Sequence, residues 1–147
     1  MKRLGRFLSL SAPDRRLLVE AALFLGAIRI GLRLLPFPTL WRLLDRARWA
    51  AMVSPSRLQP DRIIWALNVA SPYVLGVRPC LAQALAAQLL LVRRGLPARL
   101  SLGVAKGDRG QVRAHAWMET DGKIVTGGSL QEVARYTPLL ALDAQTR

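Results

Sequence analysis

Apolar side chains recur at helical spacing through the first part of the chain. They predict one helix over residues 13–35 and a second over residues 39–52. Ser11 is suited to cap the first of these, and Pro36 should end it because proline cannot continue a helix. With arginines largely away from the apolar stripes, the two segments suggest a basic helical hairpin with an apolar inner face.

Two further helices are predicted, and the second is apolar on nearly every side. The first covers residues 60–70 and should stop at Ser71-Pro72. The second covers residues 80–94, and Gly95 follows it where a C-terminal cap belongs. A helix that is apolar all round is usually buried in the core of a protein, so this one is expected at the centre of the fold.

After Gly95 the pattern changes from helical spacing to alternation. Residues 98–105, 111–120 and 123–126 predict three strands. Asp121-Gly122, between the last two, is a strong signal for a hairpin turn. The tail over residues 130–142 is too mixed to assign. Helices followed by an antiparallel sheet indicate an α+β fold, with the buried helix packed on a small sheet.

Composition adds a division of the chain and a strong positive charge. Residues 54–60 have the composition of a linker, so we expect a basic N-terminal helical region over residues 1–55 and a second domain over residues 58–147. The net charge is +13, and residues 1–57 carry 11 basic and 3 acidic side chains. Such an excess favours acidic partners, which are an acidic peptide, an anionic lipid surface or nucleic acid.

The single cysteine limits the chemistry and the compartment. One cysteine forms no intramolecular disulfide and no multi-cysteine metal site, which fits a reducing compartment. The N-terminus has no signal-peptide pattern. The apolar run over residues 17–28 is about a dozen residues long, against the roughly 20 needed to span a bilayer. We therefore expect a cytoplasmic protein with no metal and no cofactor.

Candidate chemistry rests on Cys80 and His115, the sole thiol and the sole imidazole. Cys80 begins a helix after Arg78 and Pro79, where the dipole and free N–H groups stabilise negative charge on a sulfur. His115 lies in mid-strand, and Trp117 projects to the same face. A cysteine at a helix start and a histidine on a later strand suit nucleophilic catalysis. Taken singly, each residue is more often structural than catalytic.

Five stretches carry a family resemblance: residues 80–85 (Cys-Leu-Ala-Gln-Ala-Leu), 93–100, 103–104, 114–119 (Ala-His-Ala-Trp-Met-Glu) and 121–122. Together, over about residues 58–128, they resemble the transglutaminase-like leader peptidases of lasso-peptide biosynthesis, in the standalone form that corresponds to the C-terminal part of the B protein. The resemblance implies a papain-like or transglutaminase-like cysteine-protease core.

The same resemblance implies a function and its partners. Cys80 would be the nucleophile and His115 its base, in an enzyme that cuts the leader peptide from a ribosomally made precursor. A separate leader-recognition protein would present the leader, and a separate lasso cyclase would then close the macrolactam ring. The basic N-terminal helices also resemble the short helical region that this family carries.

The chain departs from the family pattern at the third catalytic position. The family has an acidic residue about a dozen positions after the histidine, where this chain reads Thr-Gly-Gly at residues 126–128. A two-residue turn at Asp121-Gly122 would place His115 opposite the last of these glycines and put Asp121 roughly 20 Å away. Asp121 is therefore the third member only if the register differs. Glu119, Glu132 or a backbone or amide group that orients His115 are the other arrangements.

Other functions stay open. The chain could be a catalytically inactive binding or scaffold protein on the same fold, a transglutaminase that transfers an acyl group to an amine, or a basic protein that binds nucleic acid or a membrane surface. Trp117 is expected mainly to pack beside the Cys–His pair, with contact to substrate as its second role. We expect Arg42, Arg46 and Arg48 to dock an acidic partner or leader, or anionic lipid, because no nucleic-acid motif accompanies them.

Overall fold

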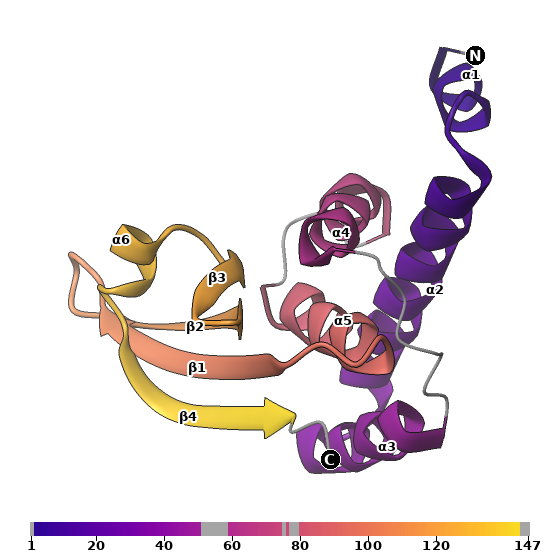
Figure 1. Ribbon diagram of the computed structural model, residues 1–147. Helices are drawn as coiled ribbons and strands as arrows, with labels where there is room; N and C mark the ends of the chain where they lie inside the picture. The colour runs from indigo at the N-terminus through magenta and orange to yellow at the C-terminus, as the bar shows by residue number, and fades with distance from the viewer. Residues whose placement is uncertain (1, 51–58, 75, 77–79, 145–147) are drawn as a thin grey trace.

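The computed structural model describes residues 2–50, 59–74, 76 and 80–144, and there helices pack against a four-stranded antiparallel sheet (Figure 1). The predicted α+β fold is confirmed. The elements in chain order are α1 (Lys2–Leu8), α2 (Ala12–Leu34), α3 (Phe37–Ala50), α4 (Pro60–Val74), α5 (Cys80–Arg93), β1 (Ala98–Lys106), β2 (Val112–Thr120), β3 (Lys123–Thr126), α6 (Leu130–Val133) and β4 (Thr137–Ala144).

The first two long helices lie close to their predicted bounds. The Asp14 backbone N–H donates to the Ser11 side chain, so Ser11 caps α2 as expected. Helix α3 begins at Phe37, two residues earlier than predicted, because a proline is tolerated in a first helical turn. Leu40 and Leu44 of α3 are buried, but Leu43 is exposed. The apolar inner face of the expected hairpin is therefore narrower than predicted.

Helix α4 continues past the position where the sequence predicted its end. Pro72 lies inside the helix, which runs to Val74. A proline removes one backbone hydrogen bond, to the carbonyl four residues earlier, and that residue is the exposed Asn68. Arg29 of α2 donates from its guanidinium to the Val74 carbonyl, which satisfies one of the carbonyls left over at the helix end.

Helix α5 is the buried helix that the sequence predicted. Every residue from Ala84 to Val92 is buried. Gly95 then ends it with a φ of 72°, and the Leu96 N–H bonds to the Leu91 carbonyl, which together form a Schellman cap. The helix packs on α2, α3 and α4 and on three strands of the sheet, so it is the central element of the fold.

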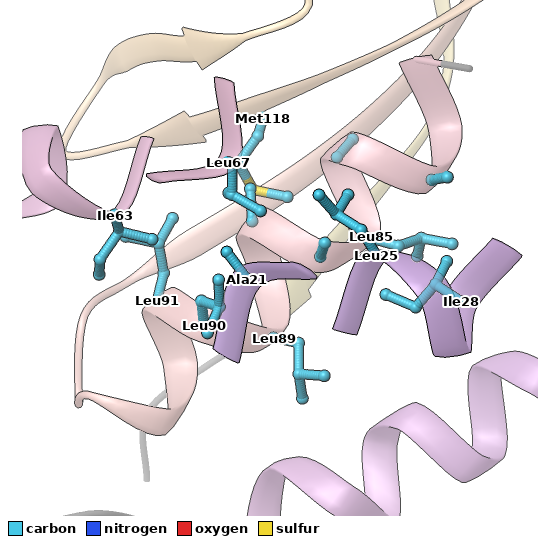
Figure 2. Packing of buried hydrophobic residues seen from close by; sticks show 14 of the residues in the cluster. Ala21, Leu25, Ile28, Ile63, Leu67, Leu85, Leu89, Leu90, Leu91 and Met118 are labelled. Carbon is cyan, nitrogen blue, oxygen red and sulfur yellow. The ribbon is translucent and has the colours of Figure 1, made fainter. Parts of the chain in front are cut away.

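One hydrophobic core joins the N-terminal helices to the rest of the chain. Figure 2 shows side chains of α2, α4, α5 and β2 meeting in this core, among them Ala21, Leu25, Leu67, Leu90 and Met118. Of the linker predicted over residues 54–60, residues 54–58 lie outside the described residues, and the division of the chain at that point stays a prediction. No helix in the described part of the chain is long and apolar enough to cross a membrane.

The sheet has the order β3-β2-β1-β4, which adds one strand, β4, to the three that were predicted. Strand β4, from the tail that the pattern left unassigned, pairs with β1 at one edge. Strand β3 pairs with β2 at the other edge, where Thr120 faces Lys123 as predicted. The register then shifts between Glu119 and Met118, and Met118 pairs with Thr126. Strand β3 ends at Thr126, so the predicted pairing of His115 with Gly128 is wrong, and a β-bulge has already shifted the register by one residue before that point.

Candidate active site

A cavity of about 930 Å³ lies between the helices and the β3 edge of the sheet. Helix α4, the first turn of α5, β2 and the segment after β3 all contribute to it. Its walls include both Cys80 and His115, so the structure brings the sole thiol and the sole imidazole to one cavity. The described residues that line it are Asn68, Ser71, Pro72, Gly76, Cys80, Gln83, His115, Val125, Thr126, Gly127, Gly128, Glu132, Arg135 and Tyr136.

Cys80 is the first residue of α5 and is partly exposed. Its position follows from the sequence pattern, because the apolar helix behind it is anchored in the core and fixes where the helix begins. The free backbone N–H groups of a helix start are also donors for an anion that forms nearby. Arg78 and Pro79, which the sequence places before this helix start, lie outside the described residues.

His115 is held by a backbone carbonyl. Its Nε2 lies 2.5 Å from the Gly127 carbonyl oxygen. A carbonyl oxygen only accepts hydrogen bonds, so Nε2 must carry the proton in this contact. In the neutral ring Nδ1 then keeps its lone pair. The imidazole is therefore oriented as a base whose free nitrogen is Nδ1.

Two glycines allow the chain to bring this carbonyl to the imidazole. Gly127 and Gly128 have φ values of 93° and 106°, in the region that favours glycine. A Cβ on Gly127 would lie 2.6 Å from both the Ala116 carbonyl oxygen and the Trp117 Cβ. The segment therefore passes so close to β2 that no side chain fits at residue 127. The Gly127 carbonyl thus takes the position beside His115 where the family pattern has an acid.

Aromatic rings flank the imidazole. The Tyr136 ring stacks on it at a centroid distance of 4.9 Å, and the Trp117 ring lies 6.3 Å away. Trp117 is only 2% exposed, and its Nε1 donates to the Glu119 carboxylate. The described lining of the cavity includes Tyr136 but not Trp117. Trp117 therefore packs beside the site, and Glu119 is bonded to Trp117 and not to His115.

Glu132 folds back to the cavity from α6. Ser129 and Glu132 form a capping box, in which the Ser129 backbone N–H donates to the Glu132 carboxylate at 2.7 Å. This hydrogen bond, then that of the Ser129 side chain, lowers the pKa of the Glu132 carboxyl, and the charges of Arg135 and His115 lower that pKa further. Glu132 is thus a carboxylate held at the wall of the cavity that His115 also lines.

Asp121 lies elsewhere. It forms the hairpin turn with Gly122, and both residues have positive φ, at 49° and 74°, as a type I′ turn requires. The described residues that line the cavity do not include it. Six positions of extended strand separate it from His115, so the turn carries its carboxylate away from the imidazole. This position suits the turn and not the orientation of His115.

Two side-chain amides from the helices also line the cavity. Gln83, one turn into α5, donates from Nε2 to the Asn68 Oδ1 of α4 at 2.7 Å. An amide whose oxygen accepts in this way still has its own NH₂ group to donate. No group of three or more His, Cys, Asp or Glu side chains within the described ranges is placed to hold a metal ion.

The sequence named Cys80 and His115 as the pair and left Glu132 and an unspecified backbone group among the possible partners of His115, but it did not point to Gly127, Tyr136 or Asn68. A signal for the segment after β3 was present. Ser-Leu-Gln-Glu at residues 129–132 has the spacing of a capping box, and the preceding Gly-Gly pair marks a turn. Together these predict that Glu132 turns back towards its own N-terminus, which is where the structure places it.

Comparison with known proteins identifies a family for most of the chain. The model of a family described as the transglutaminase-like superfamily matches residues 22–141, a span that includes α4, α5 and strands β1 to β3. Cys80 and His115 both fall within the matched span. No curated protein and no solved structure matches the chain.

Proposed function

Because the chain belongs to the transglutaminase-like superfamily, we propose that it is a cysteine peptidase with Cys80 as nucleophile and His115 as general base. The observation that carries the proposal is that one cavity is lined by Cys80, at a helix start, and by His115, whose Nε2 is tied to a carbonyl. The substrate we propose is the precursor of a lasso peptide, cut between leader and core. That choice is supported by the resemblance of residues 80–85 and 114–119 to leader peptidases.

In the first half-reaction the Cys80 sulfur attacks the carbonyl carbon of the scissile peptide bond. The thiol proton passes to His115 Nδ1, which becomes part of an imidazolium. The tetrahedral intermediate then collapses, the C–N bond breaks, and His115 returns the proton to the leaving amine. The products are the free core peptide and a thioester between the leader and Cys80.

The second half-reaction releases the leader. A water molecule loses a proton to His115 Nδ1 as its oxygen attacks the thioester carbonyl carbon. The C–S bond breaks, the proton goes to the Cys80 sulfur, and the leader leaves with a free carboxylate. If an amine attacked in place of water, the same thioester would yield an amide, which is the reaction of an acyl-transferring transglutaminase.

The negative charge on the substrate oxygen needs N–H donors at both stages. The backbone N–H of Cys80, at the start of α5, is one donor in this mechanism. The side-chain NH₂ of Asn68 is the second, because Gln83 engages the Asn68 oxygen and the amide lines the same cavity. In this mechanism the two N–H donors hold the substrate oxygen between them.

The charge on His115 needs a partner in place of the missing acid. In our proposal the Gly127 carbonyl holds Nε2–H, and the Glu132 carboxylate stabilises the imidazolium through space. A carbonyl orients the ring but carries no full charge, so the two groups divide the work that a single carboxylate does in a triad. Asp121 has no part in this mechanism.

The proposed partners follow from the proposed reaction. They are the leader of the precursor, a separate leader-recognition protein that presents it, and the lasso cyclase that takes the core peptide. We place the reaction in the cytoplasm, where a ribosomally made precursor is available. Nucleic acid is not among the proposed partners, because no recognised nucleic-acid motif accompanies the basic residues.

The test is to incubate the full chain with a lasso precursor and its leader-recognition protein and to follow the masses of the products. We expect a leader with a free carboxylate, and a loss of at least about 10⁴-fold in rate for Cys80→Ala. If a small primary amine is added, the mass of the released leader shows whether water or the amine accepted the acyl group. Cleavage at the normal rate by Cys80→Ala would contradict the proposal and favour a scaffold that only assembles other components.

A further inference from the structure

Helix α4 has a second face beside the one that lines the active-site cavity. Asn68, Ser71 and Pro72 line the active-site cavity, whereas Val69 and Tyr73 line a separate hollow of about 780 Å³. This hollow, which we call the α4 groove, lies between α1, α2 and α4. Figure 1 shows α4 lying beside α2, with α1 beyond the N-terminal end of α2.

The α4 groove has an apolar floor and a basic rim. Carbon-rich side chains of all three helices form the floor, and Arg3 and Arg6 of α1 stand at one edge. The Arg3 guanidinium lies 5.7 Å from the centre of the Tyr73 ring, which ties α1 to α4. No acidic residue is among the described residues that line it. They are Arg3, Arg6, Phe7, Leu10, Leu18, Val19, Ala22, Trp65, Val69, Ala70, Tyr73 and Val74.

The apolar surface of the groove extends beyond it. Val19 of α2 and Tyr73 of α4 are exposed at its mouth, and from Val19 an exposed apolar stripe follows α2 through Leu23 and Ile30. These residues are spaced as one face of a helix. Tyr, Trp and Arg are the residues that most often dominate binding energies at protein interfaces, and the groove holds all three. The surface is therefore built for contact with another chain.

The charges around the groove select an acidic ligand. Asp14 is already bound to Arg62 of α4, and Glu20 is bound at 2.6 Å to Arg94, the residue that follows α5. The acids of α2 are thus engaged, while Arg3 and Arg6 face the groove. A second copy of the chain, with a net charge of +13, would be repelled from this rim. A bilayer surface is flat and would not fill a concave floor.

We propose that the α4 groove binds an acidic amphipathic segment of the peptide substrate, remote from the bond that is cut. This rests on the proposed function. The α4 groove and the active-site cavity lie on different faces of α4. A helix with its side chains is about 10–12 Å across, so a segment bound in the groove lies about that far from the active-site cavity. A segment held in the groove therefore delivers the following residues of the same chain to Cys80. Its apolar residues lie on the floor and its carboxylates meet Arg3 and Arg6.

The test measures binding by fluorescence polarisation, in the full-length Cys80→Ala protein, so that no cleavage occurs. The probe is a labelled peptide of about 18 residues, or five helical turns, with Leu on one face and Glu on its flanks. A scrambled peptide of the same composition is the first control. We expect the scrambled peptide to bind at least about tenfold more weakly, because only the ordered one presents a continuous apolar face.

Matched variants then locate the site. Val69→Glu places a carboxylate in the groove, and Val112→Glu makes the same change at an exposed position on β2 outside the groove lining. We expect binding about tenfold weaker for Val69→Glu and within about twofold of the parent for Val112→Glu. The double variant Arg3→Gln/Arg6→Gln should bind the peptide more weakly, and its binding should depend less on salt. The control double variant Arg42→Gln/Arg46→Gln, on α3, should match the parent in both the strength of binding and its salt dependence.

Equal binding of the ordered and scrambled peptides, or unchanged binding to Val69→Glu, would overturn the proposal. The proposal would also be overturned if Val69→Glu weakened binding to vesicles of anionic lipid but left binding to the peptide unchanged. The groove would then be a membrane contact. Binding is read without cleavage. If the groove binds the peptide but the unmutated chain cleaves no precursor, the inference about the groove stands and only the peptidase proposal fails.

Discussion

The helical interior and the active-site cavity share helix α5 but are built in different ways. In the interior, α5 meets α2 and α4 through side chains such as Leu85 and Leu90, which are at most 1% exposed. At the cavity, the same helix contributes Cys80 at its first residue, and the group that orients His115 is a backbone carbonyl. The interior thus depends on the volume of its side chains, whereas the site depends on the path of the main chain.

This difference separates stability from activity along a single helix. A change of side-chain volume deep in α5 should alter the free energy of unfolding and leave the cavity intact. A change in the glycine segment after β3 should move the carbonyl that holds His115, even though it removes no apolar contact. The predictions below test whether the two regions respond so differently.

The largest effect on stability is expected for Leu90→Ala. Leu90 is fully buried in the core cluster, and such a truncation leaves a cavity that costs about 3–4 kcal/mol. Leu23→Ala, at an exposed position on α2, is the matched control and should cost less than about 0.5 kcal/mol. Urea unfolding gives both values. The cleavage rate per folded molecule should stay near normal for Leu90→Ala, and a large fall in that rate would break the comparison.

Most of the interior could be predicted from the sequence because apolar periodicity encodes it directly. The spacing of apolar residues gave α2 and α5 within one or two residues at each end. The pattern failed for elements whose ends or pairing are determined by tertiary contacts. Helix α4 runs through Pro72, and Arg29 of another helix satisfies the carbonyl at its end. Strand β4 was unassigned because it is an edge strand whose exposed leucines do not alternate with polar residues.

The site could be predicted only in part. Cys80 and His115 are the only residues of their type in the sequence, and their positions at a helix start and in mid-strand could be predicted from it. The partner of His115 was not, because one extra residue in β3 shifts every later pairing by one. Whether a hairpin contains a bulge depends on how its backbone packs, and so does the close approach of Gly127 to Trp117. The identity of the side chains does not encode that packing.

A smaller loss of stability, with a larger loss of activity, is expected for Gly127→Ala. Its φ of 93° and the contact of a new Cβ with the Ala116 carbonyl oxygen together cost about 2–3 kcal/mol. The displaced carbonyl would no longer hold His115, and misplacement of this kind lowers kcat by about 10²-fold. Denaturant unfolding and steady-state cleavage of the precursor measure the two effects.

Gly122→Ala is the matched control for Gly127→Ala. Gly122 also has a positive φ, of 74°, but a Cβ there would meet nothing within 4 Å. It should cost about 1 kcal/mol through backbone strain alone and leave kcat unchanged. If both alanine variants lose activity equally, the position of the Gly127 carbonyl is not what the reaction requires, and the contrast between interior and site fails.

The smallest effect is expected for Glu132→Gln, and it should depend on pH. The hydrogen bond from the Ser129 backbone N–H lowers the pKa of the Glu132 carboxyl from its ordinary value of 4.5. A lowered pKa in the folded state means that the carboxylate stabilises the fold above about pH 4.5. This contribution disappears as the pH falls through the lowered value. Unfolding at pH 7 and at pH 3 should therefore show Glu132→Gln less stable than the parent, by a smaller difference at pH 3 than at pH 7. The cost of Leu90→Ala should be the same at both pH values, because volume does not titrate.

Ser129→Ala keeps the backbone N–H, so most of the pH-dependent difference should persist in that background. A difference as large at pH 3 as at pH 7 would show that Glu132 acts by packing, as the interior does, and not by charge.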